Sequence, residues 1–159
     1  MSNDSENYSV SSLQKAITTD PLTVTPETIL IDAIAIFNQS QTTRLLTPNS
    51  LTINQGKTCI IITIDNRPVG ILTHRDIVRL IAQRVDLQNL TVGEVMTQPV
   101  ITLQETEFTH LSTTLNLLHK HNIRHLPLVN AQGKLVGLLS HRDLKNSLET
   151  DGFIETKNH

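Results

Sequence analysis

The sequence has too little of several residue types to belong to whole classes of protein. Cys59 is its only cysteine and lies in a strongly apolar stretch. A disulfide within the chain and a thiolate zinc site are therefore excluded, and a reducing compartment fits best. Trp is absent and aromatic residues make up 3% of the 159 positions. We therefore do not expect ring stacking to be the main source of affinity for a flat ligand.

Long apolar runs and charge of a single sign are missing as well. No stretch approaches the roughly 20 apolar residues that cross a bilayer, and residues 1–10 lack the basic and apolar regions of a signal peptide. The formal charge is −2, with acids and bases interspersed, so no basic field favours nucleic acid or a membrane as a partner. The 38% of hydrophobic residues is ordinary for a globular protein. We predict a cytoplasmic protein with disordered tails at residues 1–10 and 150–159.

A tandem repeat is the main feature that the sequence does have. Residues 70–76, Gly-Ile-Leu-Thr-His-Arg-Asp, recur at residues 137–143 as Gly-Leu-Leu-Ser-His-Arg-Asp, and residues 20–24 resemble residues 98–102. The offset is 78 at the front of the repeat and 67 at the back, so the first copy carries 11 extra residues in its middle. Two matched blocks in the same order indicate a duplication.

Each copy predicts the order strand, helix, strand, strand, helix, which places the chain in the α/β (α+β) fold class. Repeat 1 is expected at residues 11–85 and repeat 2 at residues 90–149. Beta-branched runs bounded by turn residues predict the strands, and apolar residues at helical spacing predict the helices. The predicted strands are Leu22–Val24, Cys59–Ile64, Val69–Leu72, Val100–Thr102, Leu126–Val129 and Leu135–Leu139. The apolar positions of the two first helices are Ile29, Leu30, Ala33, Ile34 and Phe37, and Phe108, Leu111, Leu115 and Leu118.

The connections of the repeats are also readable. Residues 65–68 and 130–134 have the composition of hairpin turns. Thr73 and Ser140 stand where each final helix begins, and their hydroxyl oxygens can accept hydrogen bonds from amides of the first turn. The insertion of repeat 1, residues 40–57, is polar and is interpreted as a surface loop with at most a turn of helix. A role in folding over a ligand stays open for it.

The repeated pattern resembles the cystathionine-β-synthase (CBS) domain over residues 11–149, on the order of its elements and its ending in Gly-apolar-apolar-Thr/Ser-x-x-Asp. In repeat 2, residues 95–100 (Val-Met-Thr-Gln-Pro-Val) and 123–129 (Ile-Arg-His-Leu-Pro-Leu-Val) also follow the family pattern. Repeat 1 departs from it, because Thr18 replaces the usual Met and residues 59–64 lack the Arg-His pair and the proline. The resemblance implies two βαββα repeats packed with pseudo-twofold symmetry, and the departure implies unequal ligand binding.

The function that this resemblance implies is regulatory. CBS pairs bind adenosine-type ligands such as AMP, ADP, ATP or S-adenosylmethionine in the cleft between repeats and pass a conformational change to a partner or output domain. The chain also looks like sensory CBS pairs of bacterial histidine kinases, so such a kinase or another output protein is an expected partner, as is a second copy in a homodimer. No tightly bound cofactor, catalytic residue or metal site is expected, and magnesium accompanying a nucleotide stays open.

The resemblance also assigns ligand contacts to particular residues. Thr73, Asp76, Ser140 and Asp143 would hold ribose and phosphate, because a carboxylate accepts from ribose hydroxyls and a helix N-terminus donates to phosphate. The alternative is that each Asp only completes a helix cap. Arg124 and His125 would contact phosphate; alternatively they are exposed groups at a strand end. The candidates for an adenine slot are Leu22, Thr23, Val100, Ile101 and Pro127, for whose apolar members core packing is an equal explanation.

Two other chemistries are weaker. His74-Arg-Asp76 echoes a protein-kinase catalytic loop, but the Asn that such a loop needs five residues after the Asp is absent, since Ile81 stands there. His119 and His121 would point in different directions on a helix and cannot grip one ion together. The remaining competitor is a CBS pair that binds no ligand and serves as a scaffold for dimerisation or docking.

Overall fold

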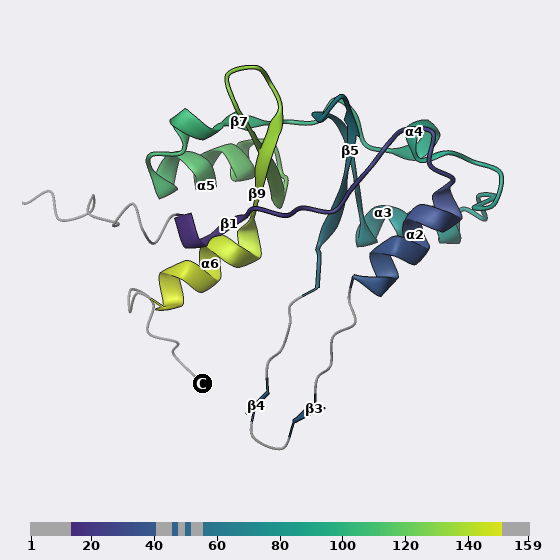
Figure 1. Cartoon of the computed structure of the whole chain (residues 1–159), viewed down its shortest axis with the longest axis horizontal. Helices are drawn as coiled ribbons and strands as arrows, with labels where there is room; N and C mark the ends of the chain where they lie inside the picture. The colour runs from purple at the N-terminus through teal and green to yellow at the C-terminus, as the bar shows by residue number, and fades with distance from the viewer. Residues whose placement is uncertain (1–13, 41–45, 48–49, 52–55, 151–159) are drawn as a thin grey trace, which may run out of the picture. The chain divides into compact units, whose positions relative to one another are not determined.

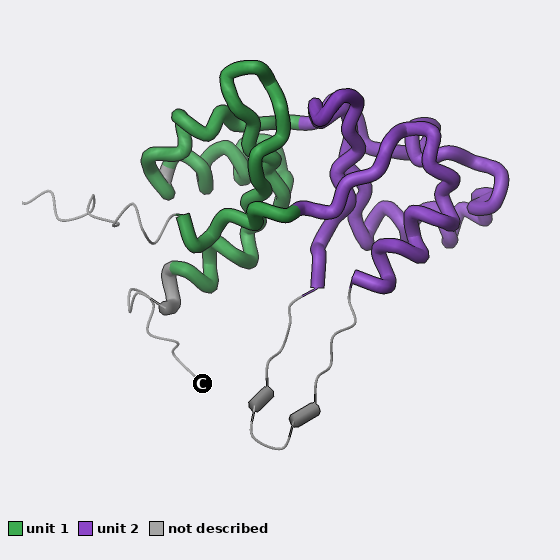
Figure 2. The backbone as a smooth tube through the Cα atoms, viewed as in Figure 1, with its two compact units in different colours: residues 1–20, 101–159 green, residues 21–100 purple. Residues whose placement is uncertain are grey.

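The computed structural model describes residues 14–40, 46–47, 50–51 and 56–150 (Figure 1). The chain forms a mixed α+β structure, as predicted, and divides into two compact units (Figure 2). Unit 1 combines residues 1–20 with residues 101–159, and unit 2 is the continuous segment 21–100. The units therefore do not coincide with the repeats, because each unit takes the short segment that precedes the other repeat's first strand.

Unit 2 is built on a three-stranded sheet in the order β2-β5-β6. Its strands are β2 (Thr23–Val24), β5 (Cys59–Ile64) and β6 (Arg67–Thr73). β2 runs parallel to β5, and β5 runs antiparallel to β6. The predicted hairpin turn lies between them, with φ values of 49° at Asp65 and 61° at Asn66. Two successive left-handed residues match the right-handed twist of the strands, which is why Asp and Asn are favoured here.

The described residues of unit 2 also form the helices α2 (Leu30–Gln39), α3 (His74–Ala82) and the short α4 (Val92–Val95). The apolar periodicity of α2 buries Leu30, Ala33 and Phe37, as predicted. The segment after α3 returns to α2, where the Leu30 N–H donates to the Leu90 carbonyl at 2.8 Å. α4 was not predicted from the sequence. The core joins these helices to β5 and β6 through Ile60, Ile62, Leu72, Ile77 and Leu80.

Unit 1 has a four-stranded sheet in the order β1-β9-β8-β7. The strands are β1 (Ile17–Thr18), β7 (Leu103–Gln104), β8 (His125–Val129) and β9 (Leu135–Ser140). The helical elements are the 3-10 turn η1 (Glu105–Glu107), α5 (Leu111–Lys120) and α6 (His141–Thr150). Its core is almost entirely leucine, with Leu111, Leu118, Leu126, Leu139 and Leu144 among its buried members.

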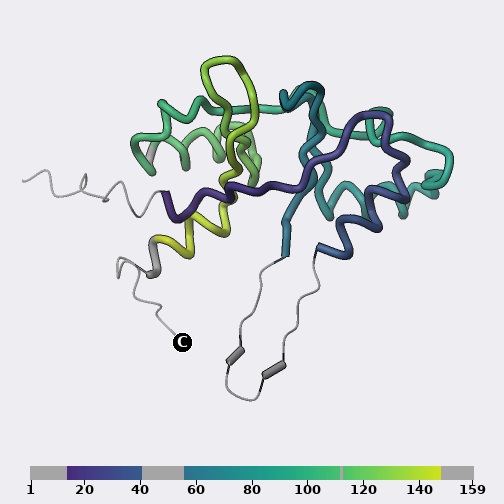
Figure 3. The backbone as a smooth tube through the Cα atoms, viewed as in Figure 1, coloured from purple at the N-terminus to yellow at the C-terminus, as the bar shows by residue number. Residues whose placement is uncertain are grey.

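The edge strand of unit 1 comes from the far end of the chain (Figure 3). Ile17 pairs antiparallel with Leu139 and Thr18 with Leu138, and in unit 2 the bridge of Thr97 to Ile71 corresponds to that of Thr18 to Leu138. A glycine lies beneath each crossing segment. A Cβ at Gly137 would lie 2.7 Å from Cγ2 of Ile17, so the segment can sit against β9 only because no side chain is there.

The same comparison corrects the sequence alignment of the two repeats. In unit 2 the corresponding glycine, Gly70, is covered by the side chain of Met96. Ile17, and not Thr18, therefore occupies the position of Met96. The offset of 78, which aligned Thr18 with Met96, was therefore wrong here by one residue. Repeat 1 has one more residue between Ile17 and Pro21 than repeat 2 has between Met96 and Pro99.

The first strand of repeat 2 also differs from its prediction. Residues 100–102 are not in a strand, and β7 begins at Leu103. In unit 2 the Ile61 N–H donates to the Leu22 carbonyl at 2.9 Å and extends the pairing at the start of β2. Pro127 has the place of Ile61 in unit 1 and has no N–H to donate. The pairing of β7 with β8 therefore starts later.

Two smaller predictions also change. Phe108 lies outside the helix that it was expected to begin, since it ends η1, and α5 starts at Leu111. In the insertion, β3 (Leu46–Thr47) and β4 (Ser50–Leu51) form an antiparallel pair, so a turn of helix was wrong for this part. The rest of residues 41–55 lies outside the described residues. So do the predicted tails, except that Thr150 ends α6. Within the described part of the chain, no helix is long and apolar enough to cross a membrane.

Candidate functional site

The start of α6 brings together four of the residues singled out from the sequence. In the β8–β9 ladder His125 lies directly opposite Ser140. The carbonyl of Arg124 accepts a hydrogen bond of 2.9 Å from the N–H of His141, the first residue of α6. Arg124 is exposed and His125 is partly buried. Two groups that can carry positive charge therefore border the helix N-terminus, where the macrodipole is also positive.

Ser140 and Asp143 form the first turn of that helix. The Ser140 hydroxyl donates to Oδ2 of Asp143 at 2.7 Å and accepts from the Asp143 N–H at 3.0 Å. Ser140 is 1% exposed, whereas the Asp143 side chain is 23% exposed. Oδ1 of Asp143 has no hydrogen bond among the described residues, and its nearest cation is Nε of Arg142 at 3.6 Å. Oδ2 of Asp143 is therefore part of the cap at the start of α6, whereas Oδ1 accepts no hydrogen bond among the described residues.

In the equivalent turn of unit 2, the carboxylate of Asp76 accepts more hydrogen bonds. Oδ2 of Asp76 accepts from the Thr73 N–H and the Thr73 hydroxyl, both at 2.9 Å. Oδ1 accepts from Nη2 of Arg79 at 3.1 Å. The Asp76 N–H donates back to the Thr73 hydroxyl at 3.3 Å and completes a capping box. The predicted N-cap roles of Thr73 and Ser140 are confirmed.

The candidates for the adenine slot fall on both units. Leu22, Thr23 and Val100 belong to unit 2, and Ile101 and Pro127 belong to unit 1. Pro127 is buried in β8, whereas Thr23 is exposed. Ile101 packs against the leucine core and Leu22 against the core of unit 2. Their contact with a ligand stays a prediction.

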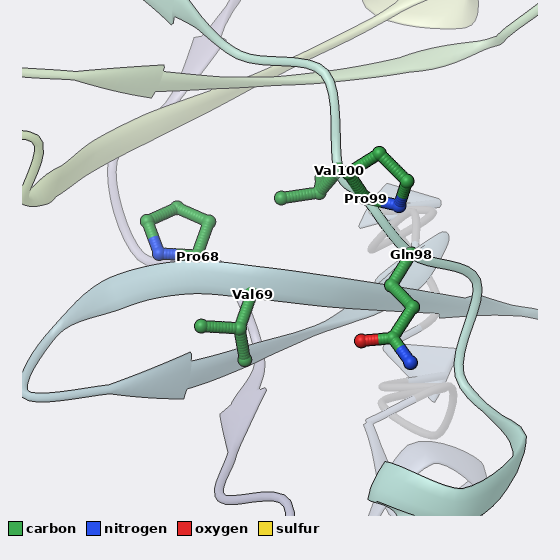
Figure 4. Close-up of a pocket in the computed structure, with 5 residues that line it drawn as sticks. All are labelled: Pro68, Val69, Gln98, Pro99 and Val100. Atoms are coloured by element: carbon green, nitrogen blue, oxygen red, sulfur yellow. The ribbon is translucent and has the colours of Figure 1, made fainter.

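An open pocket of about 440 Å³ lies in unit 2 and is lined by Pro68, Val69, Gln98, Pro99 and Val100. Figure 4 shows the side chains of Val100 and Pro68 on the same side of β6, with Gln98 as the polar member of the lining. A wall of two prolines and two valines suits a flat apolar group. Val100 was expected from the sequence. Pro68 and Val69 were missed, although a proline beside a hairpin turn marks a rigid edge.

Packing explains two further groups near these turns, the thiol of Cys59 and the ring of His74. Cys59 lies opposite Thr73 and is 1% exposed. Burial raises the pKa of its thiol to about 12, so it is neutral and unreactive. The ring of His74 stacks on Phe37 with centroids 4.2 Å apart. Within the described residues, no group of three His, Cys, Asp or Glu side chains could hold a metal ion.

The family model of the CBS domain matches residues 10–83 and 92–150. The chain belongs to the CBS domain family. The CBS match covers two segments, in agreement with the duplication. An uncharacterised 17.7 kDa protein of Acidianus ambivalens is 38% identical over 89 residues, which cover 56% of this chain and 52% of that protein. Inosine-5'-monophosphate dehydrogenase of Mycobacterium tuberculosis is 30% identical over 147 residues, 92% of this chain and 22% of that enzyme. The chain thus spans about half, or less, of these relatives.

Solved CBS structures share the fold. A protein with CBS domains from Burkholderia ambifaria superposes with a TM-score of 0.71 at 24% identity, covering 93% of this CBS chain and 98% of that chain. A CBS domain protein of Pyrobaculum aerophilum in complex with AMP gives 0.61 at 24% identity, with 82% and 92% covered. A CBS domain pair in complex with 5'-methylthioadenosine and S-adenosyl-L-methionine gives 0.65 at 21% identity, with 84% and 96% covered.

Proposed function

We propose that this CBS protein is a regulatory module that binds an adenosine-type ligand, AMP, ADP, ATP or S-adenosylmethionine. The ligand would bind at the start of α6 and favour one conformation, which a partner or output domain then recognises. The observation that carries the proposal is the β8–β9 register, in which His125 lies opposite Ser140. The groups that would bind phosphate and ribose then lie at one helix N-terminus, which supports the proposal.

Each residue has a specific proposed role. The Arg124 guanidinium offers a planar set of donors to a phosphate, and its exposure leaves the group free to reorient. His125 would add a second donor beside it. Oδ1 of Asp143 would accept from the ribose hydroxyls, while Oδ2 stays bonded to Ser140. Thr73 and Asp76 would play the same roles in unit 2, and the candidates Leu22, Thr23, Val100, Ile101 and Pro127 would contact adenine.

The solved relatives support the chemical class of the ligand. CBS proteins of the same fold hold AMP in one case and S-adenosylmethionine with 5'-methylthioadenosine in another. Both groups of ligands share adenosine and differ in what is attached to its 5′ carbon. A site with one carboxylate for ribose and a separate cation for the 5′ substituent suits the phosphate-bearing members.

Titration calorimetry on the whole chain tests this function. AMP, ADP, ATP and S-adenosylmethionine are titrated into the native protein and into Asp143→Ala, with and without magnesium. At least one ligand should bind the native protein, and the loss of a charged hydrogen-bond acceptor should weaken it by about tenfold to a hundredfold. Lys134→Ala, a change at the exposed turn between β8 and β9, is the matched control and should bind like the native protein. Absence of binding by all four ligands at millimolar concentration would reject the proposal.

A scaffold that binds no ligand is the second candidate. It is favoured by the full hydrogen bonding of Asp76, which is what a purely structural helix cap requires. In that case the chain would serve dimerisation or docking, and all four titrations would show no heat.

The partners and setting of the module are also proposals. We infer that the chain is not itself an enzyme, associates as a homodimer in the cytoplasm, and acts on a histidine kinase or another output protein. The match to a minor part of inosine-5'-monophosphate dehydrogenase is consistent with a CBS pair as an accessory to a separate functional domain. Sedimentation of the native chain, with and without the ligand found by calorimetry, measures the dimer.

A further inference from the structure

The equivalent carboxylates of Asp76 and Asp143 differ in the hydrogen bonds that they already accept. Asp76 accepts three hydrogen bonds, and the one at Oδ1 comes from the Arg79 guanidinium at 3.1 Å. The Asp143 side chain is about twice as exposed, 23% against 11%. Its Oδ1 has only the longer contact of 3.6 Å to Arg142. A ribose hydroxyl approaching Oδ1 would meet an ion pair in unit 2 and a nearly unoccupied oxygen in unit 1.

The source of this difference is a single position in the last helix of each repeat. Arg79 in α3 corresponds to Asn146 in α6, because the two helices align at an offset of 67. Both helices keep the Arg that precedes the Asp, Arg75 and Arg142. An asparagine in place of Arg79 cannot form an ion pair with the carboxylate three residues earlier.

The strands next to these helices show the opposite distribution of cations. Arg124 and His125 in unit 1 stand where unit 2 has Thr58 and Cys59, as the pairing of Cys59 with Thr73 and of His125 with Ser140 shows. Lys57 lies one residue earlier in unit 2. In unit 1, cationic groups precede the helix at Arg124 and His125, and Oδ1 of Asp143 has only the 3.6 Å contact with Arg142 among the described residues. In unit 2 the cation lies on the helix, and Arg79 donates a hydrogen bond of 3.1 Å to the carboxylate.

We propose that Arg79 closes the ligand position of unit 2 from within, so that the chain binds one nucleotide, at α6. This inference rests on the proposed function and adds its stoichiometry and the residue that sets it. To bind at Asp76, a ribose would have to displace the guanidinium from Oδ1, and no strand cation at positions 58 and 59 would compensate by holding the phosphate. Arg79 is 53% exposed, so the ion pair alone weakens binding at Asp76 by a modest factor, and the absence of a strand cation weakens it further, so that α6 is occupied first.

Exchanging the two helix residues tests the inference. AMP and ATP are titrated into the native chain, Arg79→Asn, Asn146→Arg and the conservative control Arg79→Lys, with thermal unfolding to show that each variant folds. The native chain should bind one AMP or ATP. Arg79→Asn should strengthen binding at Asp76 by about twofold to fivefold, so that a second, weaker site is detected. Asn146→Arg should weaken the first site by a similar factor, and Arg79→Lys should behave like the native chain.

The outcomes separate this inference from the function on which it rests. Two equal sites in the native chain, one of them removed by Asp76→Ala, would overturn the role of Arg79 and leave nucleotide binding intact. A native site that depends on Asp76 and not on Asp143 would do the same. An Arg79→Asn variant that is folded and still binds one nucleotide with unchanged affinity would also overturn it. No binding by any of these proteins would reject the proposed function itself, and the inference with it.

Discussion

Cys59 and His125 occupy the same register position in the two sheets, one opposite Thr73 and the other opposite Ser140. The thiol is buried at 1% exposure, whereas the imidazole is only partly buried. Because each of these positions lies opposite the residue that begins the following helix, the choice between thiol and imidazole decides which helix start has a polar neighbour. The duplication has therefore kept the backbone and changed the chemistry at this position.

Cys59 should be unreactive in the native protein and should make stability depend on pH at the alkaline end. Burial raises the pKa of the thiol from 9.0 to about 12. In the unfolded chain the thiol ionises near its ordinary value, so the unfolded state loses a proton that the native state keeps. Stability from this source is complete below about pH 9 and falls between pH 9 and pH 12, by at most about 1.4 kcal/mol per pH unit.

Denaturant unfolding of the native chain and of Cys59→Val at several pH values between 8 and 11 measures this effect. The difference in unfolding free energy between the two should shift in favour of the variant as pH rises. Labelling by a thiol reagent at pH 8 should proceed only with unfolding. Rapid labelling of the folded protein, or parallel pH curves for the two proteins, would contradict the assignment.

Ser140→Ala should destabilise unit 1 by about 1 kcal/mol, within a range of about 0.5 to 2 kcal/mol. The change removes the hydroxyl that accepts from the Asp143 N–H and donates to its carboxylate. Ser140→Thr keeps the hydroxyl and is the matched control. Urea denaturation should place the threonine variant much closer to the native chain than the alanine variant. Equal loss in both would mean that packing of the buried side chain, and not the cap, is responsible.

Gly137→Ala should destabilise the chain by about 1 to 3 kcal/mol, because the new methyl group would lie 2.7 Å from Cγ2 of Ile17. Ile17→Ala removes that methyl group and should relieve the clash. In a double-mutant cycle the combined variant should therefore be less destabilised than the sum of the two single changes. Additive effects would show that β1 does not cover Gly137.

Residues 21–100 should fold as an isolated fragment, whereas residues 11–85 should not. The first fragment is a complete compact unit. The second lacks Leu87 and Leu90, whose carbonyls accept from Ile31 and Leu30 at 2.9 and 2.8 Å, and it lacks the buried Val92. Thermal unfolding followed by circular dichroism should be cooperative for the first fragment alone. Cooperative unfolding of residues 11–85 would show that the sequence repeat is the folding unit.

The features predicted correctly from the sequence are those fixed by neighbours in the chain. The apolar spacing of α2, the Asp65-Asn66 turn and the caps at Thr73 and Ser140 depend on residues within a few positions of one another. Such local signals need no knowledge of what packs against them. The resemblance to the CBS domain rests on the same local elements in a fixed order, and the family match confirms it.

Two of the features that were wrong depend on pairing between distant segments. The late start of β7 follows from the missing N–H of Pro127, which matters only because β8 is its partner. The match of Ile17, and not Thr18, to Met96 can be recognised only once Ile17 is seen to cover Gly137. At the candidate site, Arg79 was missed although its spacing of three from Asp76 was readable in the sequence. The contacts of Leu22, Thr23, Val100, Ile101 and Pro127 with a ligand stay predictions.

The pairing of Ile17 with Leu139 sets an order of events during synthesis of the protein. Unit 2 is continuous and can fold once residue 100 has left the ribosome, but β1 must wait for β9. At about 5 to 20 residues per second, the roughly 120 intervening residues take about 6 to 24 s. Throughout that interval the segment around Ile17 is an unpaired strand that has already left the ribosome, open to other nascent chains or to a chaperone. The last strand made therefore completes the sheet to which one of the first belongs.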